Sequence, residues 1–502
     1  MSTTTAAHAT TEQENEVRFR IGLLGAFIPP IALVIGSIYF FVGEQVFDLT
    51  ALAVAGFIGI FISSWLARSQ SNFWNAAIAG VSTKTAATLF VLMLMVGLLS
   101  EMLKTTGVSS GFIWLAQTLN ISSAPFARLT FLVTGAIALA TGSSIGTMFT
   151  MFPIMYSAGV AIGAEPVLLA GAILSGAIFG DNLAPISDTT VISATTQRYR
   201  RREGLADVGG VVRARTRYAL PAAGITAIGF LIAGFVMADD SAHAVIEADA
   251  DPTGLWMLLA VAALLIVAFT KRDIYLAVGV GLVVGTITAL VTGLTDLPGI
   301  VGASEGAPTG YLITGFAGML PLIGLLVAIF SMIGIIEASG IFDRVVASLL
   351  SRPKMQSVRG AEITMGISGL LCTVVLAGLN GPGIAFAGPL TDKIGGAAGL
   401  HPYRRSNVMD CFAMVGTVVP IVSSFLLIAS VGTQGYEGVP ALSIFAIVTA
   451  AFYPFALALV LIFAIATGWG RTYEGQGGVE QADPDLEYQA ELTGTVPVMH
   501  LK

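Results

Sequence analysis

Charge is scarce in this sequence. Charged residues make up 11% and hydrophobic residues 55% of the 502 residues, whereas charged residues average about 25% in soluble domains. This composition excludes a soluble globular protein and predicts an all-α protein that crosses a membrane many times. We therefore expect the lipid bilayer as its surroundings and no nucleic acid as a partner.

Cysteines and nucleotide-binding motifs are scarce as well. The two cysteines, Cys372 and Cys411, each lie in an apolar run, which favours buried thiols over a disulfide or a metal pair. The sequence contains no Walker loop, no dinucleotide fingerprint and no His/Cys metal spacing. These absences argue against an ATP-driven pump, and we expect neither enzyme activity nor a resident cofactor.

One polar stretch, residues 180–190, stands between strongly apolar segments. It holds two carboxylates, an amide and three hydroxyls: Asp181, Asn182, Ser187, Asp188, Thr189 and Thr190. Pro185 predicts that a helix beginning at Pro166 breaks here. Irregular backbone at membrane depth survives only where it is buried in protein or lines a wet cavity, and ionisable residues there are usually functional. The stretch therefore predicts a cation site.

The distribution of charge predicts the topology. Residues 197–217 carry seven arginines and are expected in the cytoplasm, because Lys and Arg collect in cytoplasmic loops. Loops 238–254 and 294–310 are acidic and lack Lys and Arg, so we place them outside. With both termini in the cytoplasm, this pattern gives ten crossings and two re-entrant hairpins.

The two halves of the sequence repeat. Pro153 and Pro389 are separated by the same number of residues as Pro166 and Pro402. The basic inside segment 344–359 corresponds in this alignment to residues 111–125, which are uncharged. Equivalent loops therefore face opposite sides, which indicates an inverted-topology repeat, a device typical of transporters.

The predicted fold follows from this repeat. Each half contributes about five transmembrane helices and one re-entrant hairpin, with helices broken at the midplane. Three short crossings per repeat would satisfy the same topology as a hairpin and a broken helix. The hairpins are expected at 129–163 and 361–399, and the broken helices at 166–196 and 404–431. The predicted divisions are a disordered tail (1–20), the first repeat (21–237), an external acidic loop (238–254), the second repeat (255–466) and a disordered tail (467–502).

The four interruptions are expected to meet near the midplane. Asp181 is predicted as the main carrier of Na⁺ and H⁺, because a partly desolvated carboxylate holds either ion but not both. Asp188 is predicted as a second Na⁺ ligand or a positioning residue. The expected neutral ligands are Asn182, Ser187, Thr189, Ser144, Thr147, Asn380 and Thr417. Asp410 is either a second titrating group or a partner of Arg404 or Arg405.

Structural roles are an alternative explanation for some of these predicted ligands. Asp181 could cap the half-helix that follows the break, since Asp is a favoured N-cap. Ser187 and Thr189 could hydrogen-bond back to the helix, and Asn380 could serve only the tip of its hairpin. Thr417 stands where Asp181 stands in the first half, so one acidic site is the simpler expectation.

Residues 175–190 resemble the NhaC-type Na⁺/H⁺ antiporter family, whose pattern G-D-x-x-[SA]-P-[LI]-S-D-T-T they match. The resemblance implies a secondary active antiporter in the cytoplasmic membrane, with Na⁺ and H⁺ as substrates. It also implies alternating access of the elevator type and favours a homodimer. Asn182 departs from several antiporter members, which carry Lys or His there. That departure keeps open a Na⁺-coupled symporter or exchanger of a small organic acid or amino acid.

Overall fold

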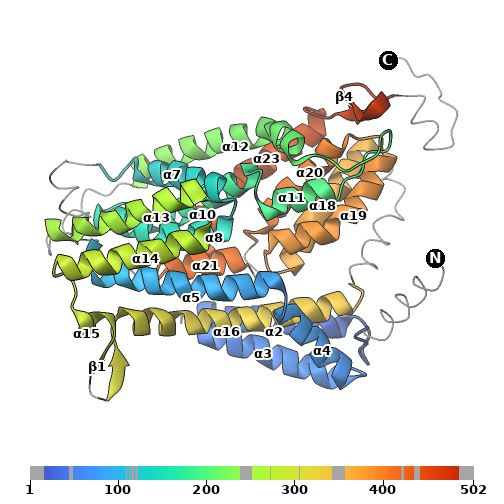
Figure 1. The fold of residues 1–502 in the computed structure, drawn as a ribbon. Helices are drawn as coiled ribbons and strands as arrows, with labels where there is room; N and C mark the ends of the chain where they lie inside the picture. Colours follow the sequence, from blue (N-terminus) through green and yellow to red (C-terminus); the bar gives the residue numbers. More distant parts are fainter. Residues whose placement is uncertain are drawn as a thin grey trace. The chain divides into compact units, whose positions relative to one another are not determined.

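The structure is a computed structural model made almost entirely of helices (Figure 1). It describes residues 16–44, 49–108, 122–237, 251–271, 273–304, 306–341, 357–419, 423–434 and 441–485, together with positions 110, 111, 114 and 118. Two small antiparallel strand pairs complete the described part: β1 (Gly302–Ser304) with β2 (Ala307–Thr309), and β3 (Tyr473–Glu474) with β4 (Glu480–Gln481). A predominantly helical fold is what the composition predicts.

The chain divides into two compact units, and each unit takes segments from both halves of the sequence. The first unit combines residues up to 102 with residues 296–347. Its elements are α2 (Leu24–Ser37), η1 (Ile38–Gly43), α3 (Leu49–Leu66), α4 (Gln70–Val81), most of α5 (Lys84–Thr105), α15 (Leu297–Ile300), β1 (Gly302–Ser304), β2 (Ala307–Thr309) and α16 (Tyr311–Ala338). In this unit α16 packs against α4 through Gly80 and Gly334, where a side chain on either glycine would overlap the backbone of the other helix.

The second unit contains residues 103–295 and 348–502 and includes the polar stretch. Its first-half elements are α7 (Phe126–Thr141), α8 (Ser144–Met151), η2 (Phe152–Tyr156), α9 (Ser157–Ala161), α10 (Pro166–Leu183), α11 (Asp188–Thr195), α12 (Val208–Met237), η4 (Pro252–Met257), α13 (Leu258–Lys271) and α14 (Ile274–Val291). Its second-half elements are α18 (Val358–Val375), α19 (Asn380–Ala397), α20 (Pro402–Gly416), α21 (Ser424–Gly432), α22 (Ile444–Thr449), α23 (Phe452–Thr467), β3 (Tyr473–Glu474), η6 (Gln476–Gly478) and β4 (Glu480–Gln481). Here α10 packs along α7, and α20 packs along α18 and α19.

Six of the described helices are long and apolar enough to cross a membrane: residues 49–66, 86–105, 166–183, 208–237, 311–338 and 358–375. Five shorter apolar helices accompany them. The composition of these helices supports an integral membrane protein. The number of crossings and the re-entrant hairpins stay predictions.

The four predicted interruptions are present in the second unit. Helix α10 ends at Leu183 and α11 begins at Asp188, on either side of Pro185. Between α7 and α8, Gly142 adopts a left-handed conformation with φ of +66°, which glycine reaches without steric cost. The two equivalent breaks lie between α18 and α19 and between α20 and α21. Residues 420–422 of the last break are outside the described residues.

The predicted disorder of the segment from residue 467 is wrong for residues 467–485. Strand β3 pairs with β4, and Tyr473 forms a bridge to Leu400. The Glu474 carboxylate is 2% exposed and accepts hydrogen bonds from the backbone N–H groups of Arg200 (2.7 Å) and Arg201 (2.8 Å). The sequence suggested a solvated acidic tail because the donors that fix Glu474 lie far away in the chain.

The N-terminal prediction needs a similar correction. Residues 16–20 of the predicted tail are ordered: Phe19 is buried, and the Val17 N–H donates to the Ala338 carbonyl. Residues 1–15 and most of the predicted external loop, 238–250, are outside the described residues. The buried apolar side chains of Val17 and Phe19 explain why the prediction of a disordered tail is wrong for residues 16–20.

Two glycines of α12 allow a test of this packing. A Cβ atom on Gly234 would overlap the carbonyl oxygen of Ala124, whereas one on Gly224 would meet nothing within 4 Å. We expect Gly234→Ala to lower the free energy of unfolding by about 1–3 kcal/mol, because overpacking forces the backbone to shift. Gly224→Ala should be neutral or slightly stabilising, because alanine is the better helix former. Thermal unfolding of the two purified variants in one detergent measures the difference, and equal melting temperatures would contradict the packing.

Candidate cation-binding site

Asp181 lies in the last turn of α10 and is 2% exposed. Its Oδ2 accepts a hydrogen bond from Ser144 Oγ at 2.9 Å. Its Oδ1 is buried and has no hydrogen-bond partner among the described residues. A buried carboxylate oxygen without a partner is costly, and a carboxylate near a helix C-terminus faces an unfavourable helix dipole. A cation or a proton at Oδ1 would relieve both penalties.

The structure also excludes a capping role for Asp181. Helix α11 has Ser187 as its N-cap residue, and Asp188 is its first helical residue. The Ser187 hydroxyl is buried and lies 2.8 Å from Thr189 Oγ1. Ser187 and Thr189 therefore hydrogen-bond to each other. Asp181 is not the N-cap of α11, so capping does not explain why a carboxylate is buried at this position.

Asp188 lies on the other side of the break and is exposed. Its Oδ1 accepts a hydrogen bond from the Thr189 backbone N–H at 2.8 Å. Its Oδ2 faces the start of α19, because a Cβ atom on Gly381 would lie 3.4 Å from it. The two predicted carboxylates thus have different environments: Asp181 is buried against α8, and Asp188 is accessible beside α19.

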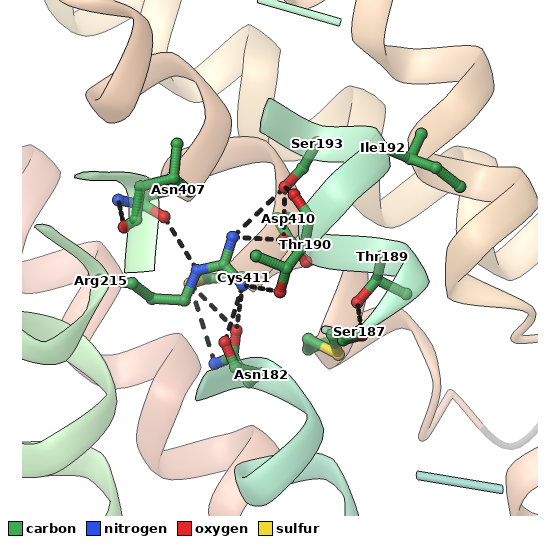
Figure 2. A network of polar contacts seen from close by, with 12 residues as sticks. Asn182, Ser187, Thr189, Thr190, Ile192, Ser193, Arg215, Asn407, Asp410 and Cys411 are labelled. Atoms are coloured by element: carbon green, nitrogen blue, oxygen red, sulfur yellow. Dashed lines mark hydrogen bonds and ion pairs between the residues drawn. The ribbon is translucent and has the colours of Figure 1, made fainter. Parts of the chain in front are cut away.

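Asn182 belongs to a buried polar network (Figure 2). Its Nδ2 donates to the Tyr453 hydroxyl at 2.9 Å. Its backbone oxygen and its Oδ1 both accept from Arg215 Nη1, at 2.7 Å and 3.2 Å. Both ends of the Asn182 amide are therefore occupied by protein groups, and its oxygens already face a guanidinium cation. This arrangement favours a positioning role over the predicted role as a Na⁺ ligand.

Asp410 forms an ion pair with Arg215, and both side chains are completely buried. Ser193 Oγ donates to the same carboxylate oxygen of Asp410 at 2.8 Å. The predicted pairing with Arg404 or Arg405 is wrong, because Arg404 pairs with Glu362 and Arg405 with Asp392, each at 2.8 Å. Asp410 is therefore a charge that the protein itself compensates.

The remaining predicted ligands lie at the other interruptions. Thr147 Oγ1 is 3.1 Å from Thr141 Oγ1. In the second half, Asn380 Nδ2 donates to the Met414 sulfur at 3.1 Å, and Thr417 Oγ1 donates to the Met414 carbonyl at 2.6 Å. The structure therefore brings Ser144 directly to Asp181, and it places Asn380 and Thr417 around Met414 instead.

The turns and the broken helices meet in pairs, one pair in each half. A Cβ atom on Gly142 would overlap Ile186, so the α7–α8 turn touches the α10–α11 break. In the second half, the Ser424 N–H donates to the Ala377 carbonyl at 2.8 Å, so the α18–α19 turn touches the α20–α21 break. Gly381, at the α18–α19 turn, also approaches Asp188 of α11, so interruptions of the two halves are neighbours in the second unit.

Arg215 is the residue that sequence reasoning missed. It was assigned to the cytoplasmic basic loop 197–217, yet it lies on α12, which begins at Val208. The neighbours Val211, Ala214 and Tyr218 are buried on the same helix. Their helical spacing places position 215 on the buried face, and this periodicity was the available signal.

Comparison with known proteins adds to this geometry. Residues 17–235 match the model of the Na⁺/H⁺ antiporter family. The match covers less than half of the 502 residues. The predicted resemblance to NhaC-type antiporters is thereby confirmed, and it includes both carboxylates of the polar stretch.

Two curated relatives extend the comparison. The chain is 28% identical over 314 residues to a malate-2H⁺/Na⁺-lactate antiporter of Bacillus subtilis, which covers 56% of this chain and 65% of the relative. It is 30% identical over 180 residues to the Na⁺/H⁺ antiporter NhaC of Alkalihalophilus pseudofirmus, covering 36% and 37% of the two chains. The chain thus spans less than two thirds of the length of either relative.

Two solved structures are also similar in part. MtrF of Neisseria gonorrhoeae, from a class of antimetabolite efflux pumps, has a TM-score of 0.37 and 12% identity, with 87% of this chain and 94% of that chain covered. The YdaH transporter of Alcanivorax borkumensis has a TM-score of 0.33 and 12% identity, with 78% and 91% covered.

The Asn182 network can be tested by stability. We expect Asn182→Ala to lower the free energy of unfolding by about 1–3 kcal/mol, because Tyr453 and Arg215 would each lose a buried partner. Asn75→Ala is the control, because Asn75 is exposed and substitution of such a residue changes stability by about 0.5 kcal/mol or less. Thermal unfolding with and without Na⁺ measures both variants. Equal losses of stability would contradict a buried role for the Asn182 amide.

Proposed function

We propose that this protein is a secondary active transporter that exchanges Na⁺ for H⁺ across the cytoplasmic membrane by alternating access. The observation that carries the proposal is the buried Asp181 carboxylate, whose Oδ1 has no hydrogen-bond partner among the described residues, at the break of an apolar helix. The family match over residues 17–235 supports the same activity.

The proposed exchange depends on charge compensation at Asp181. An empty, ionised carboxylate is costly inside an apolar bundle, so the site changes its access only when it is loaded. Na⁺ and H⁺ compete for this one carboxylate. The site therefore crosses with Na⁺ bound in one direction and with H⁺ bound in the other. Ser144 is the neutral group that the structure places against Asp181, and Asp188 with Ser187 and Thr189 completes the proposed ligand set.

The scale of the movement is part of the proposal. The chain forms two compact units, and an elevator mechanism would move the unit that contains the broken helices. In this proposal both termini face the cytoplasm, the substrates are Na⁺ and H⁺, and the protein is a homodimer. The inverted repeats, residues 21–237 and 255–466, explain how the same unit can open to either side.

A second candidate is a Na⁺-coupled carrier of a small organic acid or amino acid. It is favoured by the relative that is named as a malate-2H⁺/Na⁺-lactate antiporter. The substrate carboxylate would then bind at hydroxyl groups and at the N-termini of the half-helices α11 and α21. Asn182 would not contact that substrate directly, because its amide is occupied by Tyr453 and Arg215.

The first candidate predicts Na⁺-driven proton movement without any organic solute. The protein is reconstituted in liposomes that contain a pH-sensitive dye, and a Na⁺ gradient is imposed. We expect prompt proton movement in the wild type and its loss, by about 100-fold or more, in Asp181→Asn, because an amide cannot exchange Na⁺ for H⁺. Glu203→Gln removes an exposed carboxylate and should retain full exchange.

Two outcomes would redirect the assignment. Full exchange by folded Asp181→Asn would contradict the proposed role of this residue. If the folded wild type shows no Na⁺-driven proton movement, the second candidate is favoured. Na⁺-dependent uptake of carboxylates and amino acids would then be measured in the same liposomes.

A further inference from the structure

Arg215 and Asp410 form a completely buried ion pair in the transport site, although they come from opposite halves of the chain. Arg215 lies on α12 and Asp410 on α20. A buried charge is tolerated when it is paired and hydrogen-bonded, and removal of one partner leaves an uncompensated charge. This pair contacts Asn182, the residue that follows Asp181 in the chain.

The guanidinium of Arg215 has no donor left for a substrate. Its five N–H groups face acceptors on Asn407 (from Nε, 2.8 Å), on Asn182 and Thr190 (from Nη1, 2.7 Å and 3.0 Å), and on Ser193 and Asp410 (from Nη2, 3.3 Å to Ser193). An anion could reach this cation only by displacing protein groups. Arg215 is therefore suited to hold the site in place rather than to bind cargo.

The contacts of Arg215 bridge the broken helix. Nη1 donates both to the Asn182 backbone oxygen, at the end of α10, and to Thr190 Oγ1, in the first turn of α11. A cation at the C-terminal carbonyls of α10 is also favourable for the helix dipole. Arg215 thus fixes the two half-helices relative to each other and, through them, the Asp181 carboxylate.

The pair also contributes to the electrostatic surroundings of Asp181. The carboxylate of Asp188 acts on Asp181 more strongly than that of Asp410, and Arg215 supplies the positive charge that compensates Asp410. With both members present, the pair adds no net charge to the site. Loss of Asp410 would leave a positive charge near Asp181, and loss of Arg215 would leave a negative one.

We infer that Arg215 and Asp410 are a positioning pair that sets the cation affinity of the Asp181 site, because the intact pair adds no net charge beside that site and keeps its two half-helices in register. The inference rests on the proposed function, because it names the residues that set the affinity for Na⁺, the cation of the proposed exchange. Asp410 is then not a second carrier, because Arg215 holds its carboxylate.

The test compares the Na⁺ KM of exchange in three variants. Asp410→Asn leaves the arginine uncompensated and should raise the KM about tenfold, a change within the usual range of a coupling free energy. Arg215→Gln leaves the carboxylate uncompensated and should lower the KM. The double variant Arg215→Gln/Asp410→Asn restores neutrality and should return the KM to within about threefold of the wild type.

A second ion pair of the same unit gives the matched control. Arg201 and Asp485 pair at 2.5 Å but are partly exposed, so Arg201→Gln and Asp485→Asn should leave the Na⁺ KM unchanged. Arg215→Lys keeps the charge and loses the planar fork of donors; it should keep a near-normal KM with a reduced maximal rate. This variant and the double variant remain informative if a single neutralisation prevents folding.

Three outcomes would overturn the inference. A purely structural role would shift the KM of Asp410→Asn and Arg215→Gln in the same direction, and a carrier role for Asp410 would leave the folded double variant inactive. An unchanged KM in all pair variants, with exchange lost in Asp181→Asn, would also exclude the pair but keep the proposed function. Exchange retained in Asp181→Asn would instead remove the proposed function itself.

Discussion

Compensation of buried charge is the constraint on which the proposed transport site depends. An apolar helix bundle cannot hold an isolated carboxylate without a large free-energy cost. Among the described residues, the second unit holds two aspartates that are at most 2% exposed, Asp181 and Asp410. Each has one carboxylate oxygen without a hydrogen-bond partner among these residues. Asp410 forms an ion pair with Arg215, whereas Asp181 receives a hydroxyl, from Ser144. In the proposed function, this difference separates a structural charge from one that is left for an exchangeable ion.

The broken helices serve this constraint in two ways. They end α10 and begin α11 beside the polar stretch, so carbonyl and N–H groups become free at the depth of Asp181. They also make room for Arg215 to contact both half-helices at once through Asn182 and Thr190. A continuous helix would offer neither feature, because its backbone groups bond internally.

Local sequence predicted the interruptions well because each has a local cause. Pro185 follows the C-cap residue of α10, where its missing N–H and its ring disfavour continuation of the helix. Gly142 adopts the left-handed conformation that a sharp turn requires. The apolar surroundings of Asp181 in the sequence also predict a buried side chain, which the structure confirms. The partners of Asp410 and Glu474 could not be found in this way, because they lie some 195 and 274 residues distant in the chain. Which distant residues pair is decided by how the helices pack. The charge pattern alone therefore predicted that Arg215 lies in a cytoplasmic loop.

The interruptions in the two halves of the chain are alike in backbone arrangement and different in chemistry. Both halves bring a turn onto a broken helix, yet Thr417 occupies the position of Asp181, and its hydroxyl bonds to its own helix. The second half instead contributes the groups that surround Asn182 and Arg215: Tyr453, Asn407 and Asp410. These three lie beyond residue 235, where the family match ends. In the proposed function, the exchanging carboxylate therefore comes from the first half of the chain and the partner of Arg215, Asp410, comes from the second, so the proposed site needs both halves.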